Sequence, residues 1–422
     1  MVKPSILIVG AGAAGLIAAK ELLTDFEVTV LEAQERTGGR LRSIQHQGNT
    51  IEAGAEFVHG NVAVTIDLLK KADIAYEKVT GEMYRKKAGD FKKADEMTED
   101  WNRLLRKMKS VKEDITLQQL LQHNYPGPEN ELFRRHVQSY AEGFDLADIN
   151  KVSVKALYKE WDAEDFDNYR IPAGYSAVVK YLEENIKATG AVIHTRQAVK
   201  NVQWKQDAVT VNTESGETYT VNKLLITVPI SVLQNPGCIG HIQFSPAIHF
   251  NEKAAADIGF GTVIKVVCKF KRPFWQEDAG FILSDEFFPT WWTQLPNPIP
   301  LLTGWLGGPK AHGISNETDE TILEKALESL AAIYNLAIEF LKNELDHAWV
   351  FNWQKEDYAL GAYSYTTLQS AVARQKIKAP VDDTIFFAGE ALYSGEHPGT
   401  VEAAFVSGIQ TSALIKKIQF VL

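Results

Sequence analysis

The chain has 422 residues, enough for two domains or one elaborate domain, and its hydrophobic content of 45% is ample for large cores. Its formal net charge of −10 argues against nucleic acid as a partner, because no basic surplus exists to meet phosphates. No apolar run approaches the ~20 residues that a membrane span needs, and the first expected strand starts by Ser5, which leaves no room for a secretory signal. We therefore expect a soluble, cytoplasmic protein without a membrane partner.

The N-terminal stretch has the pattern of a nucleotide-binding unit. Residues 6–9 are a continuous apolar run, typical of a strand buried on both faces, and residues 28–31 repeat that pattern. A glycine-rich turn over 10–15 leads into a helix over 16–23, whose N-terminus offers N–H groups to phosphates. Glu32 ends the second strand, where its carboxylate can accept hydrogen bonds from a ribose diol.

Each glycine of this turn has a physical reason. Gly10 allows the tight turn, Gly12 lets a pyrophosphate approach the backbone, and Gly15 lets the helix pack close to the strand. A glycine-rich turn in some other α/β protein is the alternative. Two flanking apolar strands and an acid about 20 residues onward favour a dinucleotide site.

Two more loops rich in small residues follow. Residues 36–40 carry two glycines and end in Arg40, whose planar guanidinium suits phosphate. Residues 52–60 form a loop in which a flat ring could slide against the backbone around Gly54. A helix is expected over 61–72.

From about residue 76 the chain becomes rich in charge, and its apolar residues fall at helical spacing. Helices are expected around 101–108, 117–121 and 131–143. An acidic group closes this region: Glu160, Asp162, Glu164, Asp165 and Asp167. These acids form either a solvated loop or a negative mouth that steers cations.

The α/β pattern returns at residue 172, with a helix expected over 176–187. The strands expected next are 192–195, 199–204, 208–211, 218–221 and 224–228. The nucleotide-binding unit is therefore expected to be interrupted by the middle region and then to resume.

A lysine stands in the middle of the next expected strand, over 261–270. Lys265 has valine and isoleucine neighbours, so it either lies on a solvated sheet face or has a function in a buried site. Tryptophan is crowded after this strand, which suggests an aromatic wall or a large core. The last expected elements are a helix over 321–337, strands over 347–353 and 384–387, and a helix over 403–417.

Cys238 and Cys268 do not make a disulfide framework, and we expect two buried, reduced thiols. No spacing of histidine, cysteine or carboxylate residues suggests a metal site.

In chain order, these motifs resemble the flavin-containing amine oxidase family, which includes monoamine oxidases, polyamine and spermine oxidases, and lysine-specific histone demethylases. The resemblance rests on the N-terminal unit and on later motifs: residues 38–40, 54–55 and 226–229, Lys265, Trp353, Tyr363, and residues 387–390 and 399–402. It implies an α/β, two-domain FAD-binding flavoprotein, Rossmann-like and of the glutathione-reductase type, with a mixed α+β substrate domain inserted in segments. The implied FAD-binding domain covers 1–77, 172–254 and 358–422, and the substrate-binding domain covers 78–171 and 255–357.

The resemblance implies FAD rather than NAD. Glu32 would hold the adenosine ribose, Arg40 the pyrophosphate, the Val199 backbone the adenine, and Glu390 the ribityl chain. The last helix, starting near Thr400 and Val401, would point its N-terminus at the flavin edge that becomes negative on reduction. The other implied cofactor-binding residues are Gly10, Gly12, Ala14, Gly15, Ala33, Gly39, Gly54, Ala55, Glu56 and Gly389.

The sequence departs from the family pattern at several positions. Ala362 stands where monoamine oxidases carry the cysteine that attaches the flavin, so FAD should be noncovalent. Tyr363 matches one of the two tyrosines of their aromatic cage, but Thr400 replaces the other. Gln34 stands where the family often has arginine. The absence of a large helical insertion argues against a chromatin role, and no C-terminal membrane anchor is evident.

The implied reaction oxidises a monoamine or polyamine to an imine, which hydrolyses to an aldehyde, while O2 becomes hydrogen peroxide. The amine must be neutral, and burial against Tyr363 and Trp353 would lower its pKa. Lys265 would hold a water beside the flavin and stabilise the reduced ring. His59 would bind a distal amine or relay a proton, unless it is a structural histidine. Thr400 completes the implied catalytic set.

Two alternatives belong to other classes. One is an FAD enzyme that acts on C–C bonds, such as a desaturase or a protoporphyrinogen oxidase, which the set of Lys265, Trp353 and Tyr363 disfavours. The other is a noncatalytic flavoprotein. The sequence leaves the oligomeric state and the choice of amine open.

Overall fold

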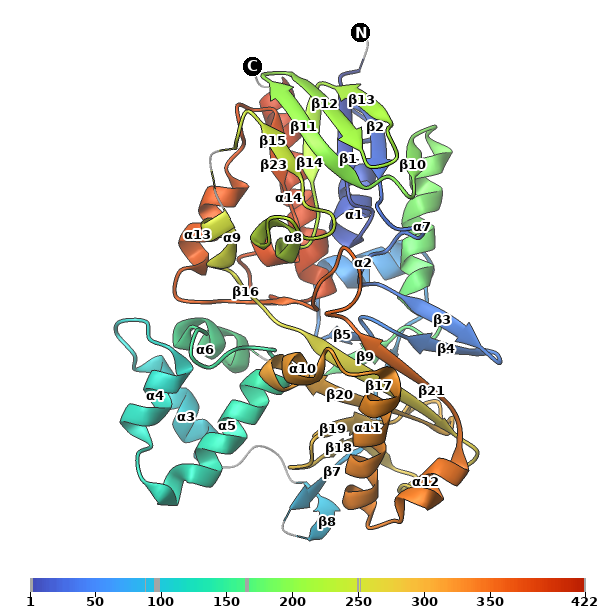
Figure 1. Ribbon diagram of the computed structural model, residues 1–422, viewed down its shortest axis with the longest axis vertical. Coiled ribbons are helices and arrows are strands. Elements are labelled where there is room, and N and C mark those ends of the chain that lie inside the picture. The colour runs from blue at the N-terminus through green and yellow to red at the C-terminus, as the bar shows by residue number, and fades with distance from the viewer. Residues whose placement is uncertain are drawn as a thin grey trace.

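The computed structural model describes residues 3–87, 89–94, 99–163, 167–248, 250 and 252–420. Figure 1 shows two regions along the long axis: a parallel sheet with its helices above, and a larger mixed sheet below with a group of helices beside it. Two of the acidic residues discussed above, Glu164 and Asp165, lie outside the described residues.

A five-stranded parallel sheet forms the centre of the upper region (Figure 1). Its strand order is β10 (Val192–His194), β2 (Glu27–Leu31), β1 (Ser5–Val9), β14 (Lys223–Ile226) and β23 (Ile385–Phe387). All four pairings are parallel, and β1 lies between β2 and β14. Three stretches of chain that are far apart in sequence thus build one sheet.

The parallel sheet is buried on both faces because successive side chains of its strands point into two cores. Ile6 and Ile8 of β1 pack in one core, and Leu7 and Val9 pack in the other. The first core includes residues of α1 (Ala13–Leu22), α2 (Ala63–Lys71), α7 (Tyr175–Ala188) and α14 (Val401–Phe420). Burial on both faces explains why the sequence of β1 is apolar over residues 6–9.

The second core is covered by a small sheet and short helices. The sheet has the order β13 (Thr218–Val221), β12 (Ala208–Thr213), β11 (Val199–Lys205) and β15 (Gln243–Ser245). The helices are α8 (Ile230–Gln234), α9 (Glu252–Ala256) and α13 (Ser370–Lys378).

The lower region is built on a seven-stranded sheet. Its order is β21 (Leu345–Asn352), β17 (Val263–Phe270), β20 (Leu301–Gly307), β19 (Thr290–Trp292), β18 (Ala279–Leu283), β7 (Glu82–Lys87) and β8 (Asp90–Lys93). Its core includes residues of α10 (Gly308–Ile314), α11 (Asp319–Tyr334) and α12 (Ile338–Glu344). Three tryptophans of this region belong to two cores: Trp291 packs with these helices, whereas Trp305 and Trp353 pack in a separate core with Ala362.

Four helices form a group with its own core beside this sheet (Figure 1): α3 (Glu99–Lys109), α4 (Leu117–Asn124), α5 (Glu131–Gly143) and α6 (Val154–Asp162). Thr116 and Gln119 form a capping box at the start of α4. The helical spacing in the sequence therefore predicts α3, α4 and α5, but not α6, whose last residues include Glu160 and Asp162 of the acidic group.

Short strands lie between the two regions: β3 (Ser43–His46), β4 (Asn49–Glu52), β5 (Phe57–His59), β6 (Glu77–Lys78), β9 (Asn168–Arg170), β16 (Gly259–Phe260) and β22 (Ser364–Tyr365). Two 3₁₀ turns lie elsewhere: η1 (Pro128–Asn130) connects α4 to α5, and η2 (Glu390–Leu392) packs against α14. Among the described residues, no helix combines the length and the apolar composition needed to cross a membrane. Cys238 and Cys268 are both free thiols, as expected, but only Cys268 is buried, and Cys238 is half-buried. The domain boundaries stay a prediction.

Candidate functional site

The first turn is built tightly around its glycines. Gly10 has a φ of +104°, in the region that favours glycine, and a side chain at Gly15 would lie 1.9 Å from the carbonyl oxygen of Gly10. By contrast, the nearest atom to a side chain built at Gly12 would be the carbonyl oxygen of Gly38, 4.0 Å away. Helix α1 therefore starts close against β1, while the space at Gly12 stays open.

The second glycine loop runs beside the first. Gly12 and Gly38 form a parallel bridge, and the Gly38 N–H donates to the carbonyl oxygen of Ala11 at 2.7 Å. Gly12 is the N-cap of α1 and makes no side-chain cap bond. The N–H groups of the first helical turn are thus left for an anionic ligand.

Glu32 lies at the end of β2, as the sequence predicts. Its Oε2 accepts from the Ala11 N–H at 2.8 Å, and its Oε1 accepts from the Gln34 N–H at 2.9 Å. Burial raises the pKa of this carboxyl group. Gln197 donates its N–H to the carbonyl oxygen of Glu32, which brings the strand that starts at Val199 beside this acid.

Arg40 and Glu390, from opposite ends of the chain, form an ion pair. Nη1 of Arg40 lies 2.8 Å from Oε1 of Glu390 and donates to the carbonyl oxygen of Ala362 at 2.5 Å. The other oxygen of Glu390 accepts from the Ser364 hydroxyl at 2.7 Å. Glu390 is buried, but 26% of the Arg40 side chain is exposed, so the guanidinium keeps an open side.

Thr400 starts the last helix. Its hydroxyl accepts from the Ala403 N–H at 3.2 Å and donates to the carbonyl oxygen of His397 at 2.6 Å, so it caps α14. A side chain at Gly399 would lie 3.0 Å from the ring of Tyr363. The structure thus brings Tyr363 next to the N-terminus of α14.

The loop before β5 lies between these parts. A side chain at Gly54 would lie 2.0 Å from the carbonyl oxygen of Arg40 and 3.1 Å from the ring of Trp353. Ala55 donates its N–H to the same oxygen of Arg40 at 3.2 Å, and Nε1 of Trp353 donates to the carbonyl oxygen of Ala53 at 2.9 Å. Only glycine fits at position 54 without a shift of its neighbours.

Lys265 reaches this loop from β17, with 1% of its side chain exposed. Its Nζ donates to Oε2 of Glu56 at 2.7 Å and to the carbonyl oxygen of Gly54 at 3.3 Å, and lies 5.7 Å from the ring centre of Trp292. The alternative of a solvated sheet face is therefore wrong for Lys265. The charge is buried because a carboxylate compensates it.

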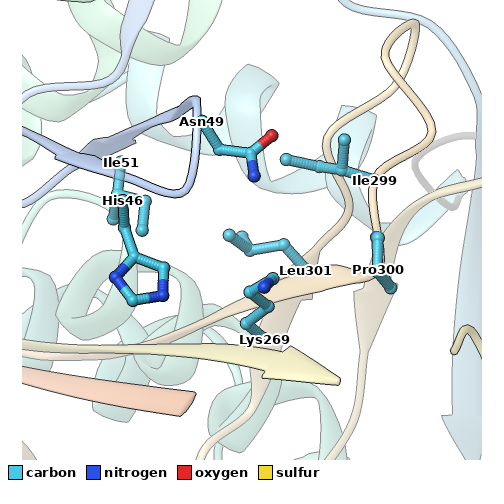
Figure 2. Close-up of a pocket in the computed structure, with 7 residues that line it drawn as sticks. All are labelled: His46, Asn49, Ile51, Lys269, Ile299, Pro300 and Leu301. Carbon is cyan, nitrogen blue, oxygen red and sulfur yellow. The ribbon is translucent and has the colours of Figure 1, made fainter. Parts of the chain in front are cut away.

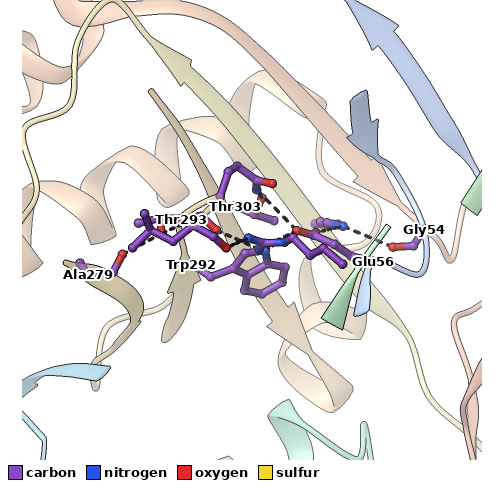
Figure 3. Close-up of polar contacts among 10 residues, drawn as sticks. Gly54, Glu56, Ala279, Trp292, Thr293 and Thr303 are labelled. Carbon is purple, nitrogen blue, oxygen red and sulfur yellow. Dashed lines mark hydrogen bonds and ion pairs between the residues drawn. The ribbon is translucent and has the colours of Figure 1, made fainter. Parts of the chain in front are cut away.

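Glu56 is the centre of a buried polar network, drawn in Figure 3. Its Oε1 accepts from the Arg170 guanidinium at 3.0 Å and from Nε1 of Trp292 at 2.9 Å. Burial acts to raise the pKa of Glu56, but the charges of Lys265 and Arg170 outweigh burial and hold this pKa below its usual range. Protein donors thus contact both oxygens of the Glu56 carboxylate.

His59 and Tyr363 are both enclosed and both linked to Phe144. Burial lowers the pKa of His59, and its Nδ1 lies 2.7 Å from Oδ1 of Asn168. Its ring packs edge-on against Phe144, whose carbonyl oxygen accepts from the Tyr363 hydroxyl at 2.5 Å. Burial also raises the pKa of Tyr363 well above its usual value. Both side chains therefore favour their neutral forms.

The acidic residues near α6 do not behave alike. Glu160 is enclosed, and burial raises its pKa to about 7 in spite of the Arg374 charge. Asp162 accepts from the Tyr158 hydroxyl at 2.9 Å. Glu160 and Asp162 lie in α6, so the interpretation as a loop is wrong for these two residues. The negative mouth stays a prediction.

Sequence reasoning misses Arg170 and Trp292. Arg170 is held by the carbonyl oxygens of Thr293 at 2.8 Å and Leu295 at 2.9 Å, and its guanidinium lies 4.8 Å from the ring centre of Phe57. No motif marks either residue. Their contact with Glu56 depends on the pairing of β9 with β5 and on the place of β19 in the large sheet.

A small cavity lies outside this network (Figure 2). It measures about 50 Å³ and none of the predicted site residues lines it. Its lining residues are His46, Asn49, Ile51, Lys269, Ile299, Pro300 and Leu301. The cavity has room for a water or two and is too small for a flavin or an amine substrate.

The residues present fit a flavin dinucleotide. The space at Gly12, the uncapped N-terminus of α1 and the open side of the Arg40 guanidinium suit a pyrophosphate. A side chain built at Gly389 would meet no atom within 4 Å, although its φ of +150° favours glycine. The N-terminus of α14 and the Gly54 loop lie at the other end, where an isoalloxazine would belong.

This arrangement defines an α/β protein of the FAD-binding class. Comparison of the sequence with known families then gives the particular one: the pattern of the flavin containing amine oxidoreductases matches residues 13–416, and the chain belongs to this family. The expected family, fold class and flavin cofactor are thereby confirmed.

Three known proteins show the range of the similarity. Lysine-specific histone demethylase 1B of Mus musculus is 25% identical over 451 residues, which cover 97% of this chain and 52% of that protein. Polyamine oxidase 2 of Arabidopsis thaliana is 25% identical over 449 residues, covering 97% and 87%. A wild-type putrescine oxidase bound to putrescine has the same fold, with a TM-score of 0.83, 20% identity, and coverage of 98% and 99%. The chain thus spans about half the length of the demethylase.

Proposed function

We propose that this protein is an FAD-dependent amine oxidase that converts an amine and O2 to an imine and hydrogen peroxide, after which water releases an aldehyde from the imine. When bound, FAD would accept the two electrons that leave the C–N group. Relatives named for polyamines and putrescine support an amine as the substrate. None of them favours chemistry on a C–C bond or a noncatalytic role.

The observation that carries this proposal is the place of Lys265. Its Nζ contacts the Gly54 loop, and that loop contacts both Arg40 and Trp353. Arg40 in turn binds the carbonyl oxygen of Ala362, one residue before Tyr363. A fixed ammonium beside the redox group would stabilise negative charge that develops there and hold a water for proton transfer.

The walls of the same site would favour a neutral amine. Trp353 is 3% exposed and the Tyr363 phenol is neutral, so both present uncharged aromatic surface. Burial against such surface disfavours an alkylammonium, which has a pKa of ~10.4 in water. His59 would assist: if Nδ1 donates to Asn168, Nε2 is left to accept a proton or a hydrogen bond from a second amine group.

A panel of monoamines, diamines and polyamines with a peroxide readout tests this function on the purified protein loaded with FAD. We expect peroxide from at least one amine in amounts equal to the amine consumed, and catalase should abolish the signal. Acid precipitation of the same preparation should release the yellow cofactor, because Ala362 offers no thiol for attachment. Bound FAD with no peroxide from any amine would contradict the proposal.

A further inference from the structure

We propose that Glu56 is a positioning residue for Lys265: its carboxylate keeps this lysine as a charged ammonium and leaves one N–H of the ammonium for the reacting site. Glu56 has this task only if the proposed function holds. No sequence motif indicates this role of Glu56, and the inference rests on contacts in the folded chain.

The first step is the burial of the charged groups. Lys265, Glu56 and Arg170 have 1%, 7% and 8% of their side chains exposed. A buried charge is tolerated when it is paired, and removing one partner leaves the other uncompensated. Lys265 has Glu56 as its ion-pair partner, at 2.7 Å.

The second step is the balance of charge. Two cations, Lys265 and Arg170, share the one carboxylate of Glu56, so the network carries one positive charge in excess. The other acid that acts on Lys265 is Glu52, whose pKa burial raises to about 7. The residues opposite Lys265 on the neighbouring strands are Trp305 and Phe351, which are uncharged.

The third step is that Arg170 is held in place and, as a cation, cannot compensate the charge of Lys265 when Glu56 is removed. Carbonyl oxygens of Thr293 and Leu295 hold its guanidinium, and Glu77 is a further acid that acts on it. Without the carboxylate, the ammonium of Lys265 would stay near this fixed cation in a buried site. Loss of its proton would then be favoured.

The fourth step concerns the directions of the N–H groups of the Lys265 ammonium. An ammonium has three N–H donors. Lys265 uses one on Oε2 of Glu56 and one on the carbonyl oxygen of Gly54. These two bonds fix the ammonium and leave the third donor. Glutamine at position 56 could keep the shape and one acceptor oxygen, so Glu56→Gln changes mainly the charge.

The first experiment follows the absorbance of bound FAD and its affinity for sulfite against pH. It compares Glu56→Gln, Lys265→Met and the double variant, each in a Glu52→Gln background that removes the titration of Glu52. We expect Glu56→Gln to add a proton-linked transition between about pH 6 and 10, with a change in sulfite affinity on the order of tenfold. The parent should lack this transition, and so should the double variant. A Glu56→Gln profile that follows the parent, or a transition that survives in the double variant, would overturn the proposal.

The second experiment needs no cofactor and measures thermal unfolding of the same set near neutral pH. We expect Glu56→Gln to lower the unfolding midpoint. Adding Lys265→Met to the Glu56→Gln variant should raise its midpoint, because the substitution removes the unpaired ammonium. This increase should exceed the change that Lys265→Met causes in the parent. Glu356→Gln, which breaks the half-buried pair with Arg42, is the matched control and should change the midpoint little. If the decreases in the unfolding midpoint caused by Glu56→Gln and Lys265→Met simply add in the double variant, the inference is contradicted. Failure of the proposed function would show itself differently, as FAD that no amine reduces while both experiments give the expected results.

Discussion

Single residues in this protein take their roles from their neighbours. Lys265 lies in a strand of valine and isoleucine, where a free ammonium would be unstable, and Glu56 at 2.7 Å makes its burial possible. Arg170 shares that carboxylate, so the network stays cationic. The chemistry proposed for Lys265 thus depends on two residues that have no motif of their own.

Lys265→Met should slow the reoxidation of reduced flavin by O2 at least about tenfold, without loss of bound FAD, because the fixed positive charge is removed. Stopped-flow mixing of the reduced protein with O2 measures the rate. Lys269→Met is the matched control: Lys269 lies on the same strand but pairs with Asp346, away from the site. An unchanged rate in Lys265→Met would disprove the role given to this lysine.

Glu52 should make the fold less stable as the pH rises. Burial raises its pKa from 4.5 to about 7, so between these values the unfolded chain has lost a proton that the folded chain keeps. Stability therefore falls with increasing pH across this window, by about 3 kcal/mol at the most. Denaturant unfolding at several pH values should show a flatter dependence for Glu52→Gln, and equal slopes for variant and wild type would contradict this assignment.

The sequence predicts a site residue where the residues around it form a recognisable local pattern. Glu32 is marked by its place after a buried strand, and Lys265 by its conflict with an apolar strand. Glu56 and Arg170 have no such signature, because 114 residues separate them and their contact arises from the pairing of β5 with β9. Their roles required the structure.

At the scale of elements, glycine contacts fix how closely helices and loops approach strands. Gly15 allows α1 to start against β1, and Gly408 does the same where α14 crosses α1: a side chain there would lie 2.5 Å from the carbonyl oxygen of Ala14. Glycine at these positions thus sets how closely the elements pack.

Gly15→Ala should weaken FAD binding strongly, because the added carbon would lie 1.9 Å from the carbonyl oxygen of Gly10 and force the turn to move. Gly313→Ala is the control in another helix, where the added carbon would meet nothing within 4 Å. That change should leave FAD binding intact and stabilise the fold by about 0.5–1 kcal/mol. Fluorescence titration with FAD and thermal unfolding measure both, and equal FAD affinity in Gly15→Ala and wild type would refute the packing argument.

Elements with a strong local pattern were predictable, and several of the shortest elements were not. The run at 6–9 is fully apolar, and 28–31 is apolar except for Thr29, because the parallel sheet is covered on both faces. The sequence shows this pattern directly. Strands of two or three residues, such as β6 and β9, show no period and exist only through their partners. The same holds for β19, a three-residue strand whose place in the large sheet no local pattern reveals.

At the scale of the whole molecule, the fold brings distant parts of the chain to one place. Arg40 from the first part and Glu390 from the last form an ion pair, while Lys265 from the large sheet contacts the loop between them. The order of motifs along the sequence indicated the family, but this convergence is a property of the assembled sheets. It explains why no single segment of the chain carries the site.

The central claim is that an amine gives its electrons to FAD bound in this protein. The most direct test is anaerobic mixing of the FAD-loaded protein with the amine panel, followed by the visible absorbance of the flavin. We predict that at least one amine bleaches the flavin completely, and that air restores the colour with release of peroxide. Flavin that stays oxidised with every amine, in a protein that is folded and fully loaded, would contradict the account.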